Sequence, residues 1–141
     1  MSNRRRGFSH ERDLVYKLWS YGLAVVRAPA SGSKARRILY PDIVAVYQGK
    51  VVAIEAKTIR KERSIYVRPE QVEKLLEFKR RAGGEAFIAI KIVGTGEWRF
   101  VRIENFKERP IRITKDMIAK ALKLEDLISL VKGVKSLKDF F

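Results

Sequence analysis

Hydrophobic and polar positions alternate with a period of two along residues 40–57, which predicts a β-hairpin. Two such runs, Y-P-D-I-V-A-V-Y and K-V-V-A-I-E-A-K, flank Gln48-Gly49, a pair that favours a two-residue turn. If Tyr47 therefore pairs with Lys50, Asp42 lies opposite Glu55 further along the hairpin. The residues that share this face of the hairpin are Asp42, Val44, Val46, Val51, Ala53, Glu55 and Lys57.

Hydrophobic residues three and four positions apart predict a helix that follows Ser9 as its N-cap and ends at Gly22. Glu11 shares the inward face of this helix, whereas Asp13 does not. The single histidine, His10, is expected to be exposed and receives no role. The residues expected on the buried face are Leu14, Val15, Leu18 and Trp19.

The rest of the chain alternates between further strand and helix patterns. A buried strand is predicted at 23–28, a short extended piece at 65–68, a second hairpin at 85–103 and a short strand at 111–113. Helices are predicted at 69–81, at 114–122 after Thr114 as cap, and at 125–131. The order predicts one α/β domain, residues 1–141, with a mixed sheet of about five strands flanked by helices. Residues 1–7 are expected to form a flexible basic arm and 132–141 a basic tail.

Charge points to a polyanionic partner. The chain has 31 Lys and Arg against 16 Asp and Glu, a formal net charge of +15, which favours nucleic acid over a merely solubilising surface. No apolar run approaches the ~20 residues of a membrane span, and no signal peptide is evident. The absence of cysteine excludes disulfides and thiolate metal sites, and it fits a protein of the cytoplasm that associates with the nucleoid.

Two basic segments are candidates for gripping phosphates. Residues 1–7 carry three arginines, and residues 29–37 combine small residues, which let a backbone approach a phosphodiester, with three cations. A solvated tail and an ordinary flexible linker are the alternative interpretations. The residues expected to contact DNA are Arg4, Arg5, Arg6, Arg27, Ser31, Gly32, Ser33, Lys34, Arg36, Arg37 and Arg68.

Asp42 and Glu55 place two like charges opposite each other, which costs stability unless a cation lies between them. Glu11 adds a third carboxylate, and such an oxygen set favours Mg²⁺, or Mn²⁺ in its place, over zinc. Lys57 on the same face could orient an attacking water or stabilise a phosphoryl transition state. With Ser31 available to hold the scissile phosphate, the residues fit metal-assisted phosphodiester hydrolysis.

The P-D…E-x-K pattern of residues 41–57 is typical of restriction-endonuclease-like nucleases. Together with G-F-S-H-E-R (7–12), A-V-V-R-A-P-A-S-G-S-K (24–34) and Y-V-R-P-E-Q (66–71), it resembles the archaeal Holliday junction resolvase family. The resemblance covers about the first 90 residues well and the rest loosely, through L-E-D-L at 124–127.

This resemblance implies a Mg²⁺-dependent, structure-selective endonuclease that resolves four-way DNA junctions in recombination and repair. It implies a homodimer that cuts two strands of like polarity, and other recombination or replication proteins are candidate partners. The family's active-site residues match Glu11, Asp42, Glu55 and Lys57, and its loop serine matches Ser31. Gln71 matches a glutamine with a supporting role.

Two alternatives stay open at this point. One is a nuclease of the same fold that acts on other branched or damaged DNA, and the other is a non-catalytic architectural DNA-binding protein. The surface that would self-associate is also open, as is the role of Phe140-Phe141. Candidates for surplus hydrophobic surface are Ile118, Leu122, Leu127, Ile128 and Leu130.

Overall fold

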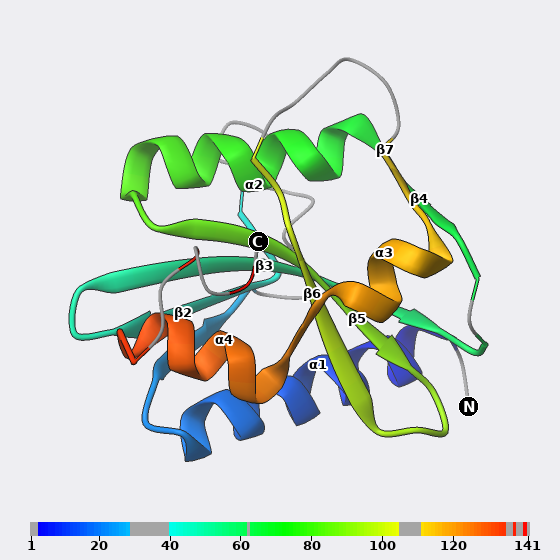
Figure 1. Cartoon of the computed structure of the whole chain (residues 1–141), viewed down its shortest axis with the longest axis horizontal. Helices are drawn as coiled ribbons and strands as arrows, with labels where there is room; N and C mark the ends of the chain where they lie inside the picture. Colours follow the sequence, from blue (N-terminus) through cyan, green and yellow to red (C-terminus); the bar gives the residue numbers. More distant parts are fainter. Residues whose placement is uncertain are drawn as a thin grey trace.

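The structure is a computed structural model that describes residues 3–28, 40–61, 63–104 and 111–134, with Leu137 and Phe140, and side chains from His10 onward. A six-stranded sheet in the order β1-β2-β3-β5-β6-β8 lies at the centre, between helices on both faces (Figure 1). Its strands are β1 (Ala24–Arg27), β2 (Ile43–Tyr47), β3 (Lys50–Ile59), β5 (Glu85–Ile92), β6 (Glu97–Arg102) and β8 (Leu122–Lys123). A separate two-stranded sheet pairs β4 (Ile65–Val67) with β7 (Ile111–Ile113), and the helices are α1 (Asn3–Ser20), α2 (Pro69–Ala82), α3 (Lys115–Lys120) and α4 (Leu124–Val131).

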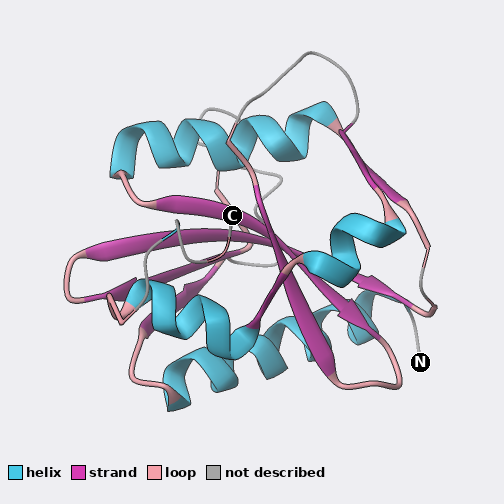
Figure 2. Ribbon diagram, in the orientation of Figure 1, coloured by secondary structure: helices cyan, strands magenta, loops and turns pink. Residues whose placement is uncertain are grey.

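The core is divided by the sheet into two hydrophobic clusters. On one face, α1 and α4 cover the sheet with side chains such as Leu14, Leu18 and Leu127. On the other face, α2 contributes Val72 and Leu75, and α3 and the small sheet complete the layer. Figure 2 shows this arrangement of helices above and below the strands. The predicted α/β class with a mixed, helix-flanked sheet is confirmed, with six strands in the main sheet.

The predicted hairpin register is also confirmed. Tyr47 pairs with Lys50 and Ile43 with Ile54. The next position in this register places Asp42 opposite Glu55. Gln48 and Gly49 have φ values of 47° and 84°, the left-handed conformation that a two-residue turn of this kind requires. All neighbouring strands of the main sheet are antiparallel except β3 and β5, whose parallel pairing needs a crossover through α2.

Local helix signals account for the helix boundaries. Pro69 stands at the first position of α2, and Gly83 follows its end. Thr114 caps α3 as predicted, because its hydroxyl accepts a hydrogen bond from the Met117 backbone N–H. None of the helices in the part of the chain that the structure describes is long and apolar enough to cross a membrane.

Several predictions for the N-terminal region were wrong. The helix begins at Asn3, not after Ser9, so residues 3–7 are helical instead of an arm, since arginine favours the helix more than the polar composition suggested. Trp19 is 62% exposed, because the buried stripe follows Leu14 and Leu18. The strand at 24–27 lies at the edge of the sheet rather than inside it, and Val26 is 69% exposed.

The C-terminal region also differs from its prediction. The helix expected at 114–122 ends at Lys120, and Leu122 pairs with Phe100 as part of β8. The residues expected to offer surplus hydrophobic surface mostly lie in the core, where Ile118, Leu122, Leu127 and Ile128 are buried. Phe140 packs against the cluster beneath α1 and α4. The helical layers therefore use the apolar side chains that a dimer surface was expected to use.

Candidate active site

Asp42 and Glu55 are held together at the point where β2 begins. The Asp42 backbone N–H donates to Glu55 Oε1 over 3.2 Å, and the Ala56 N–H donates to Asp42 Oδ2 over 2.9 Å. The regular pairing of β2 with β3 ends at Ile43 and Ile54, and these two bonds hold the next pair, Asp42 and Glu55, together. The Glu55 side chain is 1% exposed, so a carboxylate lies among the core residues next to a second one.

Two lysines approach this carboxylate pair from different elements. Lys57 follows Glu55 by two residues on β3, and its side chain therefore lies on the same face of the sheet. Lys74 comes from α2, and its Nζ lies 2.9 Å from Glu55 Oε2. That oxygen is buried, and its contact with Lys74 is an ion pair. Lys74 was not predicted as a site residue, although it lies one helical turn after Gln71.

The electrostatics of the site reflect burial of like charges. Burial, followed by hydrogen bonding and charge repulsion from Asp42, raises the pKa of Glu55 above its usual value, and Lys74 opposes the rise. Burial also lowers the pKa of Lys57, against the raising effect of the two carboxylates. The site therefore favours a state in which additional positive charge is close to the carboxylates.

Glu11 reaches this region from the other side of the sheet. It lies on α1, whose core residues pack on the face opposite to α2. Burial raises the pKa of Glu11 to about 7, and the charge of Asp42 is the next largest cause. Within the described ranges, however, no three Asp, Glu, His or Cys side chains lie close enough together to form a metal-binding group. Glu11 is near Asp42, and its role as a third ligand stays a prediction.

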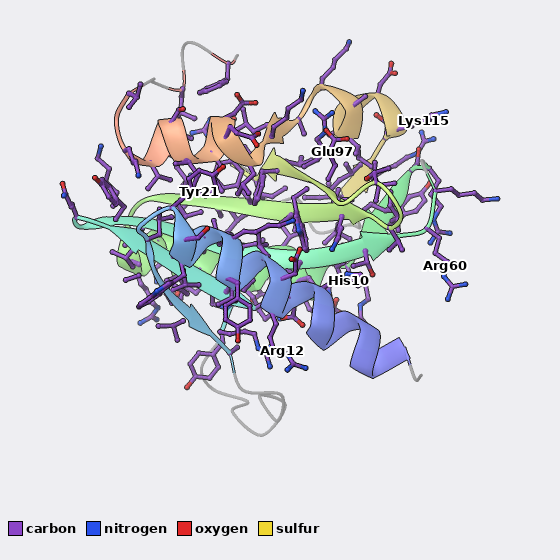
Figure 3. The ribbon with its side chains drawn as sticks, turned by 90° about the horizontal axis from the view of Figure 1, so that it is seen from below. His10, Arg12, Tyr21, Arg60, Glu97 and Lys115 are labelled. Atoms are coloured by element: carbon purple, nitrogen blue, oxygen red, sulfur yellow. The ribbon has the colours of Figure 1, made fainter. Side chains whose placement is uncertain are left out.

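The helix that carries Glu11 is fastened to the sheet by Asp13. Asp13 Oδ2 accepts hydrogen bonds from Lys91 Nζ at 3.2 Å and Trp98 Nε1 at 3.3 Å, and pairs with Lys17 at 3.2 Å. His10 is half-buried beside this network rather than exposed as predicted, because the helix begins earlier and runs across the sheet at this point (Figure 3). Burial and nearby Lys91 lower its pKa.

The structure describes the side chains of only some of the residues predicted to contact DNA. Arg27 is half-buried on β1, and its charge lowers the pKa of Glu11. Arg68 is exposed immediately before α2, and its charge contributes to lowering the pKa of Lys57. Gln71 is half-buried on α2. The remaining predicted contacts lie outside the described side chains, and these are Arg4, Arg5, Arg6, Ser31, Gly32, Ser33, Lys34, Arg36 and Arg37.

The arrangement fits a hard divalent cation. Glu55 Oε2 is a buried carboxylate oxygen without an aligned donor, and the adjacent Asp42 supplies a second carboxylate. Oxygen donors of this kind are those that Mg²⁺ and Mn²⁺ prefer. With Lys57 on the same face, the group has the residue types needed to activate water and stabilise charge at a phosphodiester.

Comparison with known proteins places this geometry in context. A family model described as archaeal Holliday junction resolvase (Hjc) matches residues 2–136. The chain is 38% identical over 135 residues to the crossover junction endodeoxyribonuclease Hjc of Sulfurisphaera tokodaii, covering 94% of this chain and 92% of that one. It is 36% identical over 129 residues to the Hje enzyme of Sulfolobus acidocaldarius, covering 90% and 87%. The crystal structure of Archaeoglobus fulgidus Hjc, a Holliday junction resolvase, matches with a TM-score of 0.76 and 31% identity over 86% of this chain and 99% of that one.

Proposed function

Because the chain belongs to the archaeal Holliday junction resolvase (Hjc) family, we propose that its crossover junction endodeoxyribonuclease activity uses Mg²⁺ at the Asp42–Glu55 pair. The observation that carries this proposal is the pair of neighbouring carboxylates, one of them buried, which accept backbone N–H hydrogen bonds across the hairpin and have Lys57 on the same face. Mn²⁺ could substitute, since it accepts the same oxygen ligands. The same-fold alternative, a nuclease for other branched or damaged DNA, differs in substrate and is separated by the assay below.

In the proposed site, Asp42 and Glu55 hold the ion and Glu11 completes the set from α1. The bound ion would supply an acidified water and neutralise charge on a phosphoryl oxygen. Lys57 orients that water or stabilises the negative charge that develops on the phosphoryl group. Ser31 holds the scissile phosphate, and Gln71 supports the arrangement from α2.

The substrate is Holliday junction DNA, and we expect recognition through shape and phosphate positions instead of base edges. Arg27 and Arg68 border the proposed ion site and fit phosphate contacts next to it. The arginines of residues 4–6 and the cations of residues 34–37 would extend the grip along the arms. Such binding should weaken with salt. The logarithm of the association constant should fall with the logarithm of the salt concentration, with a slope of about 0.9 for each phosphate neutralised. The setting that we propose is chromosomal DNA in the cytoplasm.

A homodimer is the proposed assembly, because paired cuts on opposite arms need two identical sites at a fixed separation. An apolar patch on the sheet fits this role. Val26 pairs with Val44, and Ala24 with Val46, so all four face the α2 side of the sheet, on which Asp42 is also predicted. Val26 is 69% exposed. Aliphatic side chains offer nothing to a phosphate, and burying them against a second copy would offset repulsion between two strongly basic chains.

The dimer proposal can be tested at Val26. We expect Val26→Lys to yield monomers in light scattering after gel filtration, while the wild type elutes as a dimer. Met117→Lys is the control, because Met117 is 43% exposed on α3, which packs on β6, near the opposite edge of the sheet from β1. A monomeric wild type, or a Val26→Lys variant that remains dimeric, would show that this surface is not the interface.

The activity proposal is tested with a four-way junction, a flap and a linear duplex at matched salt. We expect cleavage of the junction only with a divalent ion, at paired symmetric positions. Asp42→Asn and Lys57→Ala should abolish cutting while junction binding remains, because neither substitution removes the surrounding cations. Equal or better cleavage of the flap would favour the alternative nuclease, and cleavage in the presence of EDTA would exclude the proposed ion.

A further inference from the structure

Lys74 contacts the same carboxylate oxygen that the proposed ion would use. Its ammonium lies 2.9 Å from Glu55 Oε2, whereas Oε1 accepts the Asp42 backbone N–H. Since Oε1 is engaged in the hairpin, Oε2 is the oxygen that remains for another ligand. Within the described residues, this ion pair with Lys74 is the contact that occupies Oε2.

A divalent ion bound at Oε2 would stand within a few ångströms of the Lys74 ammonium. Like charges at ~4 Å repel strongly even where solvent screens them in part. The two cations therefore compete for one oxygen, and ion binding requires that the ammonium move away.

Lys74 is the partner that can move. The Glu55 side chain is 1% exposed and fixed in the sheet, whereas that of Lys74 is 29% exposed on the flank of α2. Lysine carries its charge on a flexible four-carbon stem with three donors, so it can exchange one anion for another within reach. On a basic nuclease, the anion that arrives at this site is a phosphate of the DNA.

We propose that Lys74 is a displaceable counter-ion of Glu55, which leaves this carboxylate when a divalent ion binds and contacts a phosphate of the bound junction. This inference rests on the proposed function, since it takes Glu55 as an ion ligand. It makes Lys74 a positioning residue that couples two ligands: DNA draws the ammonium away and strengthens ion binding, and the ion strengthens DNA binding by the same factor.

The first experiment measures Mg²⁺ binding to the free protein by titration calorimetry. We expect Lys74→Met to bind Mg²⁺ about fivefold more tightly than the wild type, the order of magnitude expected when one partly buried ion pair no longer has to be broken. Lys74→Arg should bind like the wild type, because it keeps the competing charge. Lys79→Met is the matched control: Lys79 lies on the same helix with a 25% exposed side chain, but pairs with Glu85 at 3.6 Å, outside the site.

The second experiment measures the dissociation constant of a fluorescent four-way junction with and without Ca²⁺ at constant ionic strength. Ca²⁺ should tighten junction binding by the wild type and by Lys79→Met, and clearly less by Lys74→Met. The inference is overturned if Lys74→Met binds Mg²⁺ no more tightly than the wild type, or if Ca²⁺ tightens junction binding equally in both. A wild type that binds no Mg²⁺, or cuts without it, would instead overturn the proposed function.

Discussion

Replacement of the buried acid Glu55 by glutamine should make the protein more stable at alkaline pH while it removes cleavage. The pKa of Glu55 is raised from 4.5 to about 8, chiefly by burial and then by Asp42. An acid with a raised folded pKa contributes stability that is fully present below its unfolded pKa and is lost as pH rises through the folded value. In the presence of EDTA, the wild type should therefore lose stability between pH 5 and pH 8.

The expected change in the free energy of unfolding follows from the unfolded and folded pKa values of Glu55. Each pH unit between the two pKa values changes the free energy of unfolding by about 1.4 kcal/mol, so the three units from pH 5 to pH 8 give about 4 kcal/mol as an upper bound. This bound already includes the opposing effect of Lys74, and we expect about 2 kcal/mol for Glu55→Gln at pH 8, because relaxation and water penetration reduce the cost of a buried charge. Glutamine keeps an oxygen for the Asp42 N–H. In the variant, the free energy of unfolding should still fall somewhat with pH because of Glu11, whose pKa is raised to about 7.

The assay is urea unfolding at pH 5, 6, 7 and 8 with EDTA, followed through the fluorescence of buried Trp98. Glu77→Gln is the control on α2, because the side-chain hydrogen bonds from Arg80 and Arg81 lower the pKa of Glu77 to about 2. It stays ionised throughout the range, so its removal should leave the slope unchanged. A wild-type stability that is constant from pH 5 to 8, or a Glu55→Gln variant that follows the wild-type slope, would show that the pKa of Glu55 is not raised by burial.

Three further predictions concern the scaffold. One residue inserted into the turn 48–49 should reduce junction cleavage by at least ~100-fold with circular dichroism preserved, because it moves Asp42 to the other face of the sheet; near wild-type cleavage would contradict the register argument. Gly84→Ala should lower the free energy of unfolding by more than ~2 kcal/mol, since its Cβ would lie 1.9 Å from the Val51 carbonyl oxygen at φ +84°; unchanged urea stability would contradict this. Asp13→Ala should cost about 1–3 kcal/mol in the same measurement, because buried donors on the sheet lose their acceptor.

The hairpin that carries Asp42 and Glu55 could be predicted because its geometry is local. A two-residue turn fixes the pairing of both strands, and the period of two then fixes which side chains share a face. The juxtaposition of Asp42 and Glu55 follows from those two facts alone, as the observed register confirms. The inward direction of Glu11 could likewise be predicted from the helical period relative to Leu14 and Leu18.

The missed features depend on tertiary placement. Lys74 reaches Glu55 only because the crossover brings α2 over β3, and no local pattern of α2 specifies that contact. The pairing of β4 with β7 joins segments far apart in the sequence, and each is three residues long. Trp19 was misplaced because the helical period gives the direction of a hydrophobic stripe but not its width, which the neighbouring layer decides.

The two helical layers contribute to the site from opposite faces of the sheet, with Glu11 on α1 and Lys74 on α2. A chain in which either layer has separated from the strands therefore lacks a residue of the proposed site. Cleavage should be lost on heating as soon as the less stable layer opens, before the sheet itself unfolds. For a crossover junction endodeoxyribonuclease, this dependence would act as a safeguard, because incompletely folded copies would leave DNA intact.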